Sequence, residues 1–258
     1  MGDTAMGRKG LIGGKLSHSY SKIIHELLTD YTYDLIELTP EELGPFLTAR
    51  DFDGLNVTMP YKRDVIPYLD ELDRNAARIG AVNCIVNREG HLTGYNTDCG
   101  GFDYMMTHNG VSVEGKKVLV LGNGGAAQAV LAALRDHSPA QIILAKPRPS
   151  EATITIEEAY ENHADAQVVV NTSPVGMYPK VDASPLDLSR FPACEAVLDI
   201  VYNPVKTKLL AQAESLGMTA VGGIDMLVSQ AFIAAELFTG KRYDESRIPE
   251  IAEKLFSL

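Results

Sequence analysis

The sequence predicts an α/β protein with two domains, because strand-like and helix-like segments alternate along almost the whole chain of 258 residues. The alternation restarts near residue 99, and the final helical segments follow the second series of strands. Hydrophobic residues make up 45% of the chain, which is ample for a core, and the length favours more than one domain. We therefore expect a first domain of residues 1–98 plus 226–258, with a second domain of residues 99–225 inserted into it.

The first domain opens with a β-α-β-α-β alternation, which favours a parallel or mixed sheet. Strands are expected at KGLIGG (9–14), YDLIEL (33–38) and FDGLNVT (52–58), and helices at SKIIHELLTDY (21–31), TPEELGPFLTA (39–49) and DELDRNAARIG (70–80). Thr39 is the expected N-cap of the second helix, with Pro40 at its first position, and Gly80 suits the end of the third. AVNCIVN and HLTGYN are expected to pair as a hairpin across REG.

The second domain repeats the alternation of strands and helices. Its strands are expected within KKVLVL, AQIILAK, ADAQVVVNTSP, EAVLDIVYNP and MTAVGG. Helices are expected at AAQAVLAALRDH and TKLLAQAESLG. The segment DMLVSQAFIAAELFTG (225–240) is nearly all apolar, so we expect a helix buried between layers. A last helix, PEIAEKLFSL (249–258), closes the chain.

Composition argues against several classes of partner and site. Lys and Arg number 23 against 34 Asp and Glu, and the net charge of −11 disfavours nucleic acid and anionic membrane surfaces. No apolar run is long enough to span a bilayer, and MGDTAMGRKG lacks the apolar core of a signal peptide. Three widely spaced cysteines and six isolated histidines predict neither a disulfide framework nor a metal site. We expect a cytoplasmic monomer or homodimer that binds a small molecule.

The segment VLVLGNGGAAQAVLAAL predicts a dinucleotide site. Gly122, Gly124 and Gly125 directly follow a hydrophobic strand and precede a helix. In a Rossmann-like fold the first glycine makes a tight turn, and the second lets the pyrophosphate approach the helix N-terminus, while Ala127 is small enough for helix–strand packing. The cofactor-binding residues expected in this turn are Gly122, Asn123, Gly124, Gly125 and Ala126. The alternative is a glycine-rich turn that only packs a helix on a sheet.

The end of the next strand favours NADP over NAD. A site for NAD usually has Asp or Glu about 20 residues after the glycines, where it bonds the ribose 2′-hydroxyl. The segment LAKPRPS has no carboxylate at this place, but it has Lys146 and Arg148. Two cations at this strand end suit a 2′-phosphate, so NADP is the expected cofactor. The alternative for both residues is a solvated basic loop.

Polar residues cluster at strand ends in the first domain. Thr58 and Lys62 lie in NVTMPYK, Asn83 lies in GAVN, and Asp98 lies in NTD. Together with LGNGGAA, NTSPVGM, DIVYNP and GGIDMLVSQAFIAAELFTG, these motifs resemble, in this order, the shikimate dehydrogenase family. The resemblance covers nearly the whole chain, from residue 13 to about residue 240.

The resemblance implies a substrate-binding α/β domain and a Rossmann-like NADP-binding domain, with an active-site cleft between them. It implies an oxidoreductase that reversibly reduces 3-dehydroshikimate to shikimate with NADPH, in the chorismate pathway of aromatic amino acid biosynthesis. By motif position it implies a catalytic Lys62 with Asp98 as its partner. The implied substrate contacts are Ser19, Ser21, Thr58, Asn83, Tyr202 and Gln230. Ile200 and Gly223 fall where the family approaches the nicotinamide.

The types of these residues fit the implied chemistry. Oxidation of a secondary alcohol transfers a hydride and leaves one proton to remove, and the reverse reaction must supply that proton. A lysine can do both only if burial or nearby positive charge weakens its hold on the proton, whereas a carboxylate strengthens that hold. Lys62 and Asp98 are therefore a coupled pair, and which of them moves the proton stays open. The alternatives are a surface lysine at a helix start and an aspartate that caps a helix.

Three substrate contacts also have a physical basis. Ser19 and Ser21 are two residues apart, so in an extended segment both hydroxyls point to one side and can donate to one carboxylate. Ser21 alternatively caps the following helix. Gln230 is the polar exception in an apolar helix, and a buried amide needs partners that substrate hydroxyls or another helix can supply. Tyr202 alternatively packs at a strand end.

The chain departs from the family pattern in two regions. Lys15 and Lys22 stand where the family usually has prolines, and residues 145–148 are AKPR where it usually has Asn-Arg-Thr. Lys22 lies near the expected carboxylate site, so it bears on substrate choice. Three alternatives to a shikimate dehydrogenase stay open: a relative with broader substrate or cofactor use that accepts quinate, a non-catalytic NADP sensor, and a tetrahydrofolate dehydrogenase. A sensor has no need of a lysine–aspartate pair, and the serines with Gln230 favour a carboxylate-bearing polyol.

Overall fold

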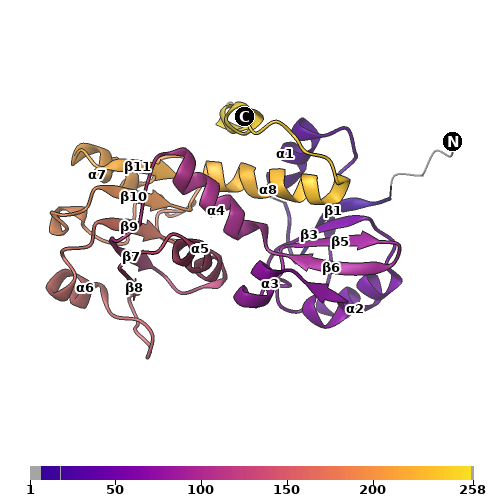
Figure 1. Cartoon of the computed structure of the whole chain (residues 1–258), viewed down its shortest axis with the longest axis horizontal. Helices are drawn as coiled ribbons and strands as arrows, with labels where there is room; N and C mark the ends of the chain where they lie inside the picture. Colours follow the sequence, from indigo (N-terminus) through magenta and orange to yellow (C-terminus); the bar gives the residue numbers. More distant parts are fainter. Residues whose placement is uncertain (1–6, 18, 257–258) are drawn as a thin grey trace. The chain divides into compact units, whose positions relative to one another are not determined.

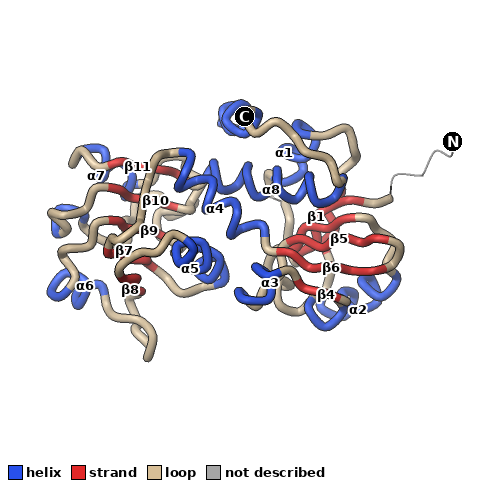
Figure 2. The backbone as a smooth tube through the Cα atoms, in the orientation of Figure 1, coloured by secondary structure: helices blue, strands red, loops and turns tan. Residues whose placement is uncertain are grey.

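The computed structural model describes residues 7–17 and 19–256, which form two compact units (Figure 1). The first unit comprises Met1–Gly100 and Val228–Leu258, and the second comprises Gly101–Leu227. Each unit has its own β-sheet accompanied by helices, as Figure 2 shows, so the prediction of an α/β protein is confirmed. The unit boundaries fall within α4 (Thr97–His108) and α8 (Ile224–Thr239).

The first unit contains a mixed six-stranded sheet in the order β2-β1-β3-β5-β6-β4. Its strands are β1 (Lys9–Gly13), β2 (Asp34–Glu37), β3 (Gly54–Val57), β4 (Glu71–Leu72), β5 (Cys84–Arg88) and β6 (His91–Tyr95). Strand β1 is parallel to β2 and β3, whereas β5 is antiparallel to both β3 and β6. The hairpin expected across residues 88–90 is therefore confirmed, and of the two sheet types expected the mixed one is present.

Capping residues set the helix limits in the first unit. The helices that begin and end there are α1 (Ser21–Leu28), α2 (Pro40–Ala49), α3 (Arg74–Ile79) and α9 (Arg247–Phe256), with a 3-10 turn η1 (Ile66–Tyr68). Thr39 and Glu42 form a capping box before α2, and Gly80 ends α3 at a φ of 69°. The expected start of α3 at residue 70 is wrong, because Asp73 accepts the Ala76 N–H and starts the helix there, after β4 has paired with β6.

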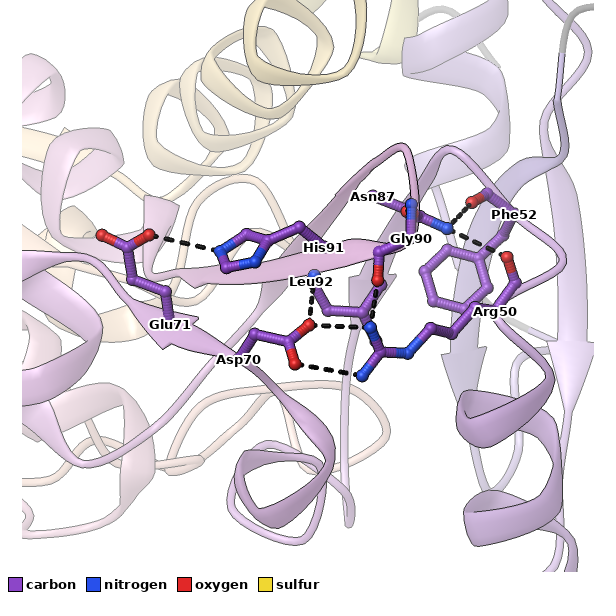
Figure 3. Close-up of polar contacts among 8 residues, drawn as sticks. All are labelled: Arg50, Phe52, Asp70, Glu71, Asn87, Gly90, His91 and Leu92. Carbon is purple, nitrogen blue, oxygen red and sulfur yellow. Dashed lines mark hydrogen bonds and ion pairs between the residues drawn. The ribbon is translucent and has the colours of Figure 1, made fainter.

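A polar cluster fixes the turn of the β5–β6 hairpin (Figure 3). The Arg50 guanidinium donates to both carboxylate oxygens of Asp70, at 2.9 and 3.1 Å, and to the Gly90 carbonyl. Asp70 also accepts the Leu92 N–H at 2.8 Å, and this bond and the one from Arg50 lower the pKa of its carboxyl. Asn87 accepts the Gly90 N–H at 2.8 Å. These bonds hold the far end of the hairpin, whose other end leads directly into α4.

The second unit contains a fully parallel five-stranded sheet in the order β11-β10-β9-β7-β8. Its strands are β7 (Lys117–Leu121), β8 (Gln141–Ala145), β9 (Val168–Asn171), β10 (Ala196–Asp199) and β11 (Thr219–Gly222). Its helices are α5 (Gly125–Asp136), α6 (Ile156–Asn162) and α7 (Lys208–Ser215), with a 3-10 turn η2 (Leu188–Arg190). Because β7 lies between β8 and β9, the order reverses at its carboxyl end, which is where Rossmann-like sheets bind ligands.

Each sheet has its own hydrophobic core. In the second unit Leu119, Val169 and Val197 come from three adjacent parallel strands and are fully buried. In the first unit, Tyr33 packs with Phe238 of α8 in one of the clusters beside the mixed sheet. Among the described residues, no helix has both the length and the apolar character needed to cross a membrane.

Candidate active site

Lys62 lies in a turn that other parts of the first unit hold in place. Its carbonyl oxygen accepts the Val82 N–H at 2.7 Å. The preceding residue, Tyr61, is buried and donates its hydroxyl to the Leu38 carbonyl at 2.6 Å. The backbone of Lys62 is thus fixed on both sides, while 28% of its side chain stays exposed. The alternative of a surface lysine at a helix start is wrong, because this segment forms a turn.

Asp98 forms an ion pair with Lys62. The Lys62 Nζ lies 2.5 Å from Asp98 Oδ2, and 15% of the aspartate side chain is exposed. Asp98 is the second residue of α4, where the helix dipole favours a negative charge. It lies inside the helix, so the alternative of an N-cap is wrong. The carboxylate orients the ammonium and leaves its other N–H groups for a reactant.

Asn83 and Gln230 both contact Thr97, the first residue of α4, which directly precedes Asp98. The Asn83 Oδ1 accepts the Thr97 N–H at 2.7 Å, and its Nδ2 donates to Thr97 Oγ1 at 3.0 Å. The Thr97 hydroxyl also donates to Gln230 Oε1 at 3.4 Å. Asn83 and Thr97 are almost fully buried. The start of the helix that carries Asp98 is therefore held by two of the side chains expected to contact the substrate.

Thr97 is a member of this cluster that the expected site residues did not include. It stands in the NTD motif immediately before Asp98, and its hydroxyl joins two expected substrate contacts. Its position in that motif could have marked Thr97 as a site residue. Its hydrogen-bond partners, however, are distant in sequence, so the motif alone does not predict them.

The two serines lie at the start of α1. Ser19 Oγ accepts the Ser21 N–H at 3.2 Å, and the Ser19 N–H donates to the Leu16 carbonyl at 3.0 Å. The helix begins at Ser21 with Tyr20 as N-cap, so the alternative of Ser21 as N-cap is wrong. Ser19 instead accepts an N–H at the helix start, and both serines are half-buried. Hydroxyls and N–H groups at a helix start form a donor set suited to a carboxylate.

The other candidates in the first unit differ in whether their side chains already have partners within the protein. Thr58 follows β3 directly, is half-buried, and its methyl group packs closely against Gly13. Lys22 donates to the Tyr33 carbonyl at 2.7 Å and pairs with Glu26 at 2.7 Å. Its charge is therefore balanced within the first unit. The structure gives Lys15 an exposed position.

The glycine turn of the second unit is open to a ligand. Gly122 has a φ of 104°, and a Cβ there would lie 2.9 Å from Thr172 Oγ1, so the turn requires glycine. Gly124 is the N-cap of α5 and offers no side-chain cap to its N–H groups. Apart from the chain neighbours and the backbone of α5 itself, no described residue comes within 4 Å of where a Cβ of Gly124 or Gly125 would stand. Exposed Asn123 flanks the turn, and the whole arrangement fits a pyrophosphate at a helix N-terminus.

Lys146 and Arg148 follow β8, the neighbour of β7. The Lys146 N–H is bonded to the Ile154 carbonyl at 3.0 Å, which fixes its backbone. Arg148 is exposed, and neither cation has an acidic partner within residues 7–17 and 19–256. Both charges are therefore available to an anionic group of a ligand.

Ile200 and Gly223 are in direct contact in the second unit. A Cβ on Gly223 would lie 2.2 Å from the Ile200 carbonyl oxygen, so only glycine allows this approach. The Gly223 N–H also donates to the Val201 carbonyl at 3.2 Å. Tyr202 follows closely, with 36% of the residue exposed. The two residues expected near the nicotinamide thus share one backbone contact.

A buried carboxylate supports that contact and was missed among the expected site residues. Asp199 is fully buried and accepts bonds from Asn171 Nδ2 at 2.9 Å, Thr207 Oγ1 at 2.7 Å and the Val201 N–H at 3.1 Å. Burial raises the pKa of Asp199, and these hydrogen bonds oppose the rise. Asp199 precedes Ile200 and ends a fully buried strand. A charged residue at the end of an apolar strand is the feature of the sequence that could have identified it as part of the site.

The described residues contain no cluster of three or more His, Cys, Asp or Glu side chains able to hold a metal ion. Cys84, Cys99 and Cys194 form no disulfide and are buried. Burial raises the pKa of the Cys194 thiol to about 11.

Comparison with known proteins identifies one family. A family model described as the shikimate dehydrogenase substrate binding domain matches residues 11–85. Shikimate dehydrogenase (NADP(+)) of Clostridium beijerinckii is 37% identical, over 96% of each chain.

Three solved structures extend the likeness over both units. A chorismate mutase/shikimate 5-dehydrogenase fusion protein from Clostridium acetobutylicum has a TM-score of 0.91 at 36% identity, covering 98% of this chain and 97% of that one. Shikimate 5-dehydrogenase from Thermus thermophilus, in complex with NADP(H) and shikimate, has a TM-score of 0.85 at 33% identity, covering 96% and 99%. Quinate dehydrogenase from Corynebacterium glutamicum, in complex with NAD, has a TM-score of 0.85 at 31% identity, covering 97% and 98%.

Proposed function

Because this chain belongs to the shikimate dehydrogenase family, we propose that it catalyses the reversible reduction of 3-dehydroshikimate to shikimate with NADPH, in the chorismate pathway. The resemblance of the sequence to this family is confirmed. The observation that carries the proposal is the ion pair of Lys62 with Asp98 at 2.5 Å, in the unit where Asn83 and Gln230 both contact Thr97. A sensor that only binds the cofactor has no use for such a pair.

The second unit holds NADP in this proposal. Gly122, Asn123, Gly124, Gly125 and Ala126 take the pyrophosphate at the start of α5, and Lys146 and Arg148 take the 2′-phosphate. Ile200 and Gly223 lie along the nicotinamide. The bound cofactor supplies or accepts the hydride. The support for this assignment is the open glycine turn and the two cations without acidic partners among the described residues.

Lys62 handles the proton. Reduction of a ketone creates negative charge on its oxygen, and the Lys62 ammonium donates a proton to that oxygen. In the reverse direction the neutral amine takes the proton from the alcohol. Asp98 keeps Nζ in one orientation through both directions, because its carboxylate is fixed at the start of α4. The greater exposure of Lys62 than of Asp98 favours the lysine as the group that meets the substrate.

The remaining candidates orient the substrate. Ser19 and Ser21 donate to its carboxylate at the start of α1, and Thr58, Asn83 and Gln230 contact its hydroxyls. Tyr202 lines the substrate site. Neutral donors suit this carboxylate, because they leave no unpaired cation buried before the substrate arrives.

The test is an assay of reduced cofactor by its absorbance, after the folded protein is mixed with shikimate and NADP. Formation of NADPH supports the proposal. Binding of NADP without turnover identifies a sensor, and turnover with a folate substrate instead identifies a tetrahydrofolate dehydrogenase. We also propose that the protein is a monomer or homodimer of the cytoplasm, and size-exclusion chromatography of the same sample tests its oligomeric state.

A second candidate function is oxidation of quinate. It is favoured by the likeness to a quinate dehydrogenase bound to NAD. Shikimate and quinate, each assayed with NADP and with NAD at matched concentrations, separate the two functions. A kcat/KM for quinate equal to or above that for shikimate favours the second.

A further inference from the structure

A chain of hydrogen bonds runs through the interior of the first unit to the start of α4. The Tyr33 hydroxyl donates to Asn56 Oδ1 at 2.8 Å, and Asn56 Nδ2 donates to the Asn83 carbonyl at 3.2 Å. The Asn83 side chain then accepts the Thr97 N–H at 2.7 Å. All four residues are buried. The chain ends one residue before Asp98.

The partners of Asn56 leave this chain only one direction, and Tyr33 supplies its first donor. An amide side chain has one accepting and one donating end, and Asn56 is buried in β3, where either wrong end would leave a polar group unpaired. The Asn83 carbonyl can only accept, so the NH₂ end of Asn56 faces it, and the Tyr33 hydroxyl then donates to the Asn56 oxygen at the other end. The Tyr33 ring is itself fixed by stacking on His25, with ring centroids 4.1 Å apart and planes at 10°.

The same hydroxyl lies close to the proposed carboxylate anchor. Burial raises the pKa of Tyr33 far above its usual value, and a hydrogen bond from the Ser21 side chain opposes this rise. Ser21 opens α1, and His25 lies one turn further along the same helix. Tyr33 therefore connects α1, which carries one of the serines, with the segment that carries Asn83.

We propose that Tyr33 is a positioning residue for the reaction: through Asn56 it fixes the Asn83 cap on α4 and thereby the place of Asp98 beside Lys62. This inference rests on the proposed function, because it concerns the same lysine–aspartate pair. Tyr33 touches neither reacting group, and its effect passes through the backbone carbonyl of Asn83.

Tyr31 provides a matched control. It is buried like Tyr33, packs in the same cluster, and its hydroxyl shares a hydrogen bond of 2.6 Å with a different partner, His25 Nδ1. Tyr31→Phe and Tyr33→Phe thus remove one buried hydroxyl each, two residues apart. Only Tyr33→Phe interrupts the chain that leads to α4.

The experiment compares kcat and KM of the wild-type protein, Tyr31→Phe and Tyr33→Phe in the shikimate assay, with thermal unfolding measured alongside. We expect similar losses of melting temperature in the two variants, but a kcat about 10-fold lower only in Tyr33→Phe, because small misplacements of reacting groups are costly. Equal kcat values in the two variants overturn the proposal. Absence of turnover in the wild-type protein overturns the proposed function instead.

A second readout does not depend on turnover. Hydrogen exchange of the Thr97 amide, followed by NMR, reports directly on its bond to Asn83 Oδ1. We expect faster exchange in Tyr33→Phe than in Tyr31→Phe, and equal rates contradict the inference whatever the substrate is. Asn56→Ala interrupts the same chain of hydrogen bonds with the Tyr33 ring intact. It replaces Tyr33→Phe in the experiment if that variant does not fold. Its exchange at Thr97 is expected to be faster than in Tyr31→Phe, and an unchanged rate overturns the proposal.

Discussion

The lysine–aspartate pair of the first unit is made of side chains, whereas the glycine turn of the second unit is made of backbone. Lys62 and Asp98 are side chains, and each is held by other parts of the unit, through the Val82 N–H and through the Asn83 cap. The turn at residues 122–125 offers backbone N–H groups, open space and no capping side chain. The first site is therefore ordered by the protein itself, whereas the second leaves its donors for an anion to satisfy.

Removal of the Lys62 amine is expected to have the largest effect on turnover. Lys62→Ala should lower kcat for shikimate oxidation by at least ~100-fold, the usual scale for a general acid–base group. The NADPH dissociation constant should stay the same, because the glycine turn belongs to the other unit. Steady-state kinetics and a fluorescence titration of NADPH measure the two quantities.

Lys206→Ala is the matched control for Lys62→Ala. Lys206 forms an ion pair with Glu214 on the surface of the second unit, and exposed pairs contribute little. We expect its kcat to stay within about twofold of the wild-type value, since surface substitutions of this kind rarely disturb a distant site. Near-normal turnover of Lys62→Ala would remove this lysine from the chemistry.

The same contrast explains how much of the molecule could be predicted from its sequence. The turn at Gly122 is local, because its strand, glycines and helix are consecutive, so both its structure and its ligand class follow from one segment. The pairing of Lys62 with Asp98 spans 36 residues and was reached only through the order of the family motifs. Nothing in the sequence marked Tyr33 as a residue that supports the site, because an aromatic residue beside a strand is ordinarily part of a core.

Errors at element boundaries also have a non-local cause. Asp70 and Asp73 are both acceptable helix caps in sequence, and the pairing of β4 with β6 decides in favour of Asp73. At the start of α1, Ser21 is the better N-cap by residue type, yet Ser19 accepts its N–H and Tyr20 takes the N-cap position. In both cases tertiary or neighbouring contacts override a local preference.

The pH dependence of stability sharpens the comparison, because each unit buries a titratable group. Burial lowers the pKa of His25 to about 3, so the folded first unit keeps it neutral while the unfolded chain protonates it below its ordinary value of 6.5. Stability should then fall as pH falls from 6.5 toward 3, by about 1.4 kcal/mol per pH unit. Asp199 has the opposite effect. Because its pKa is raised in the folded protein, its contribution to the free energy of unfolding declines as pH rises above 3.8.

His25→Phe isolates the histidine contribution. The variant keeps a ring that can stack on Tyr33, but it cannot bind a proton. We compare the free energies of unfolding of the wild-type protein and the variant, measured in urea between pH 6.5 and 4.5. As pH falls, the value for the wild-type protein should decrease relative to that for the variant, with the slope expected for uptake of about one proton on unfolding. A constant difference would show that His25 is protonated equally in both states.

Gly122→Ala is expected to damage the second site and leave the first intact. Its φ of 104° strains any residue with a Cβ, which here would also press on Thr172 Oγ1, at a cost of about 1–2 kcal/mol. If the turn must keep this strained conformation to bind NADPH, the strain lowers the affinity, and we expect binding up to about 30-fold weaker. Gly217→Ala is the control, because Gly217 also has a left-handed φ, of 76°, but stands away from the turn. Equal NADPH affinity in the two variants contradicts a role of the turn in binding.

Lys146→Glu tests the cofactor preference, and it carries the smallest effect of the four. A carboxylate at this strand end repels a 2′-phosphate and can bond a ribose 2′-hydroxyl, so the ratio of kcat/KM for NADP to that for NAD should fall about 10-fold. Lys180→Glu makes the same change of charge at an exposed position of the second unit, and it separates a local contact from the field of the whole protein. Equal ratios in the two variants would assign the phosphate to another residue, with Arg148 the next to be replaced. A fall confined to Lys146→Glu would instead show that the basic pair after β8 selects the cofactor although it departs from the usual family pattern.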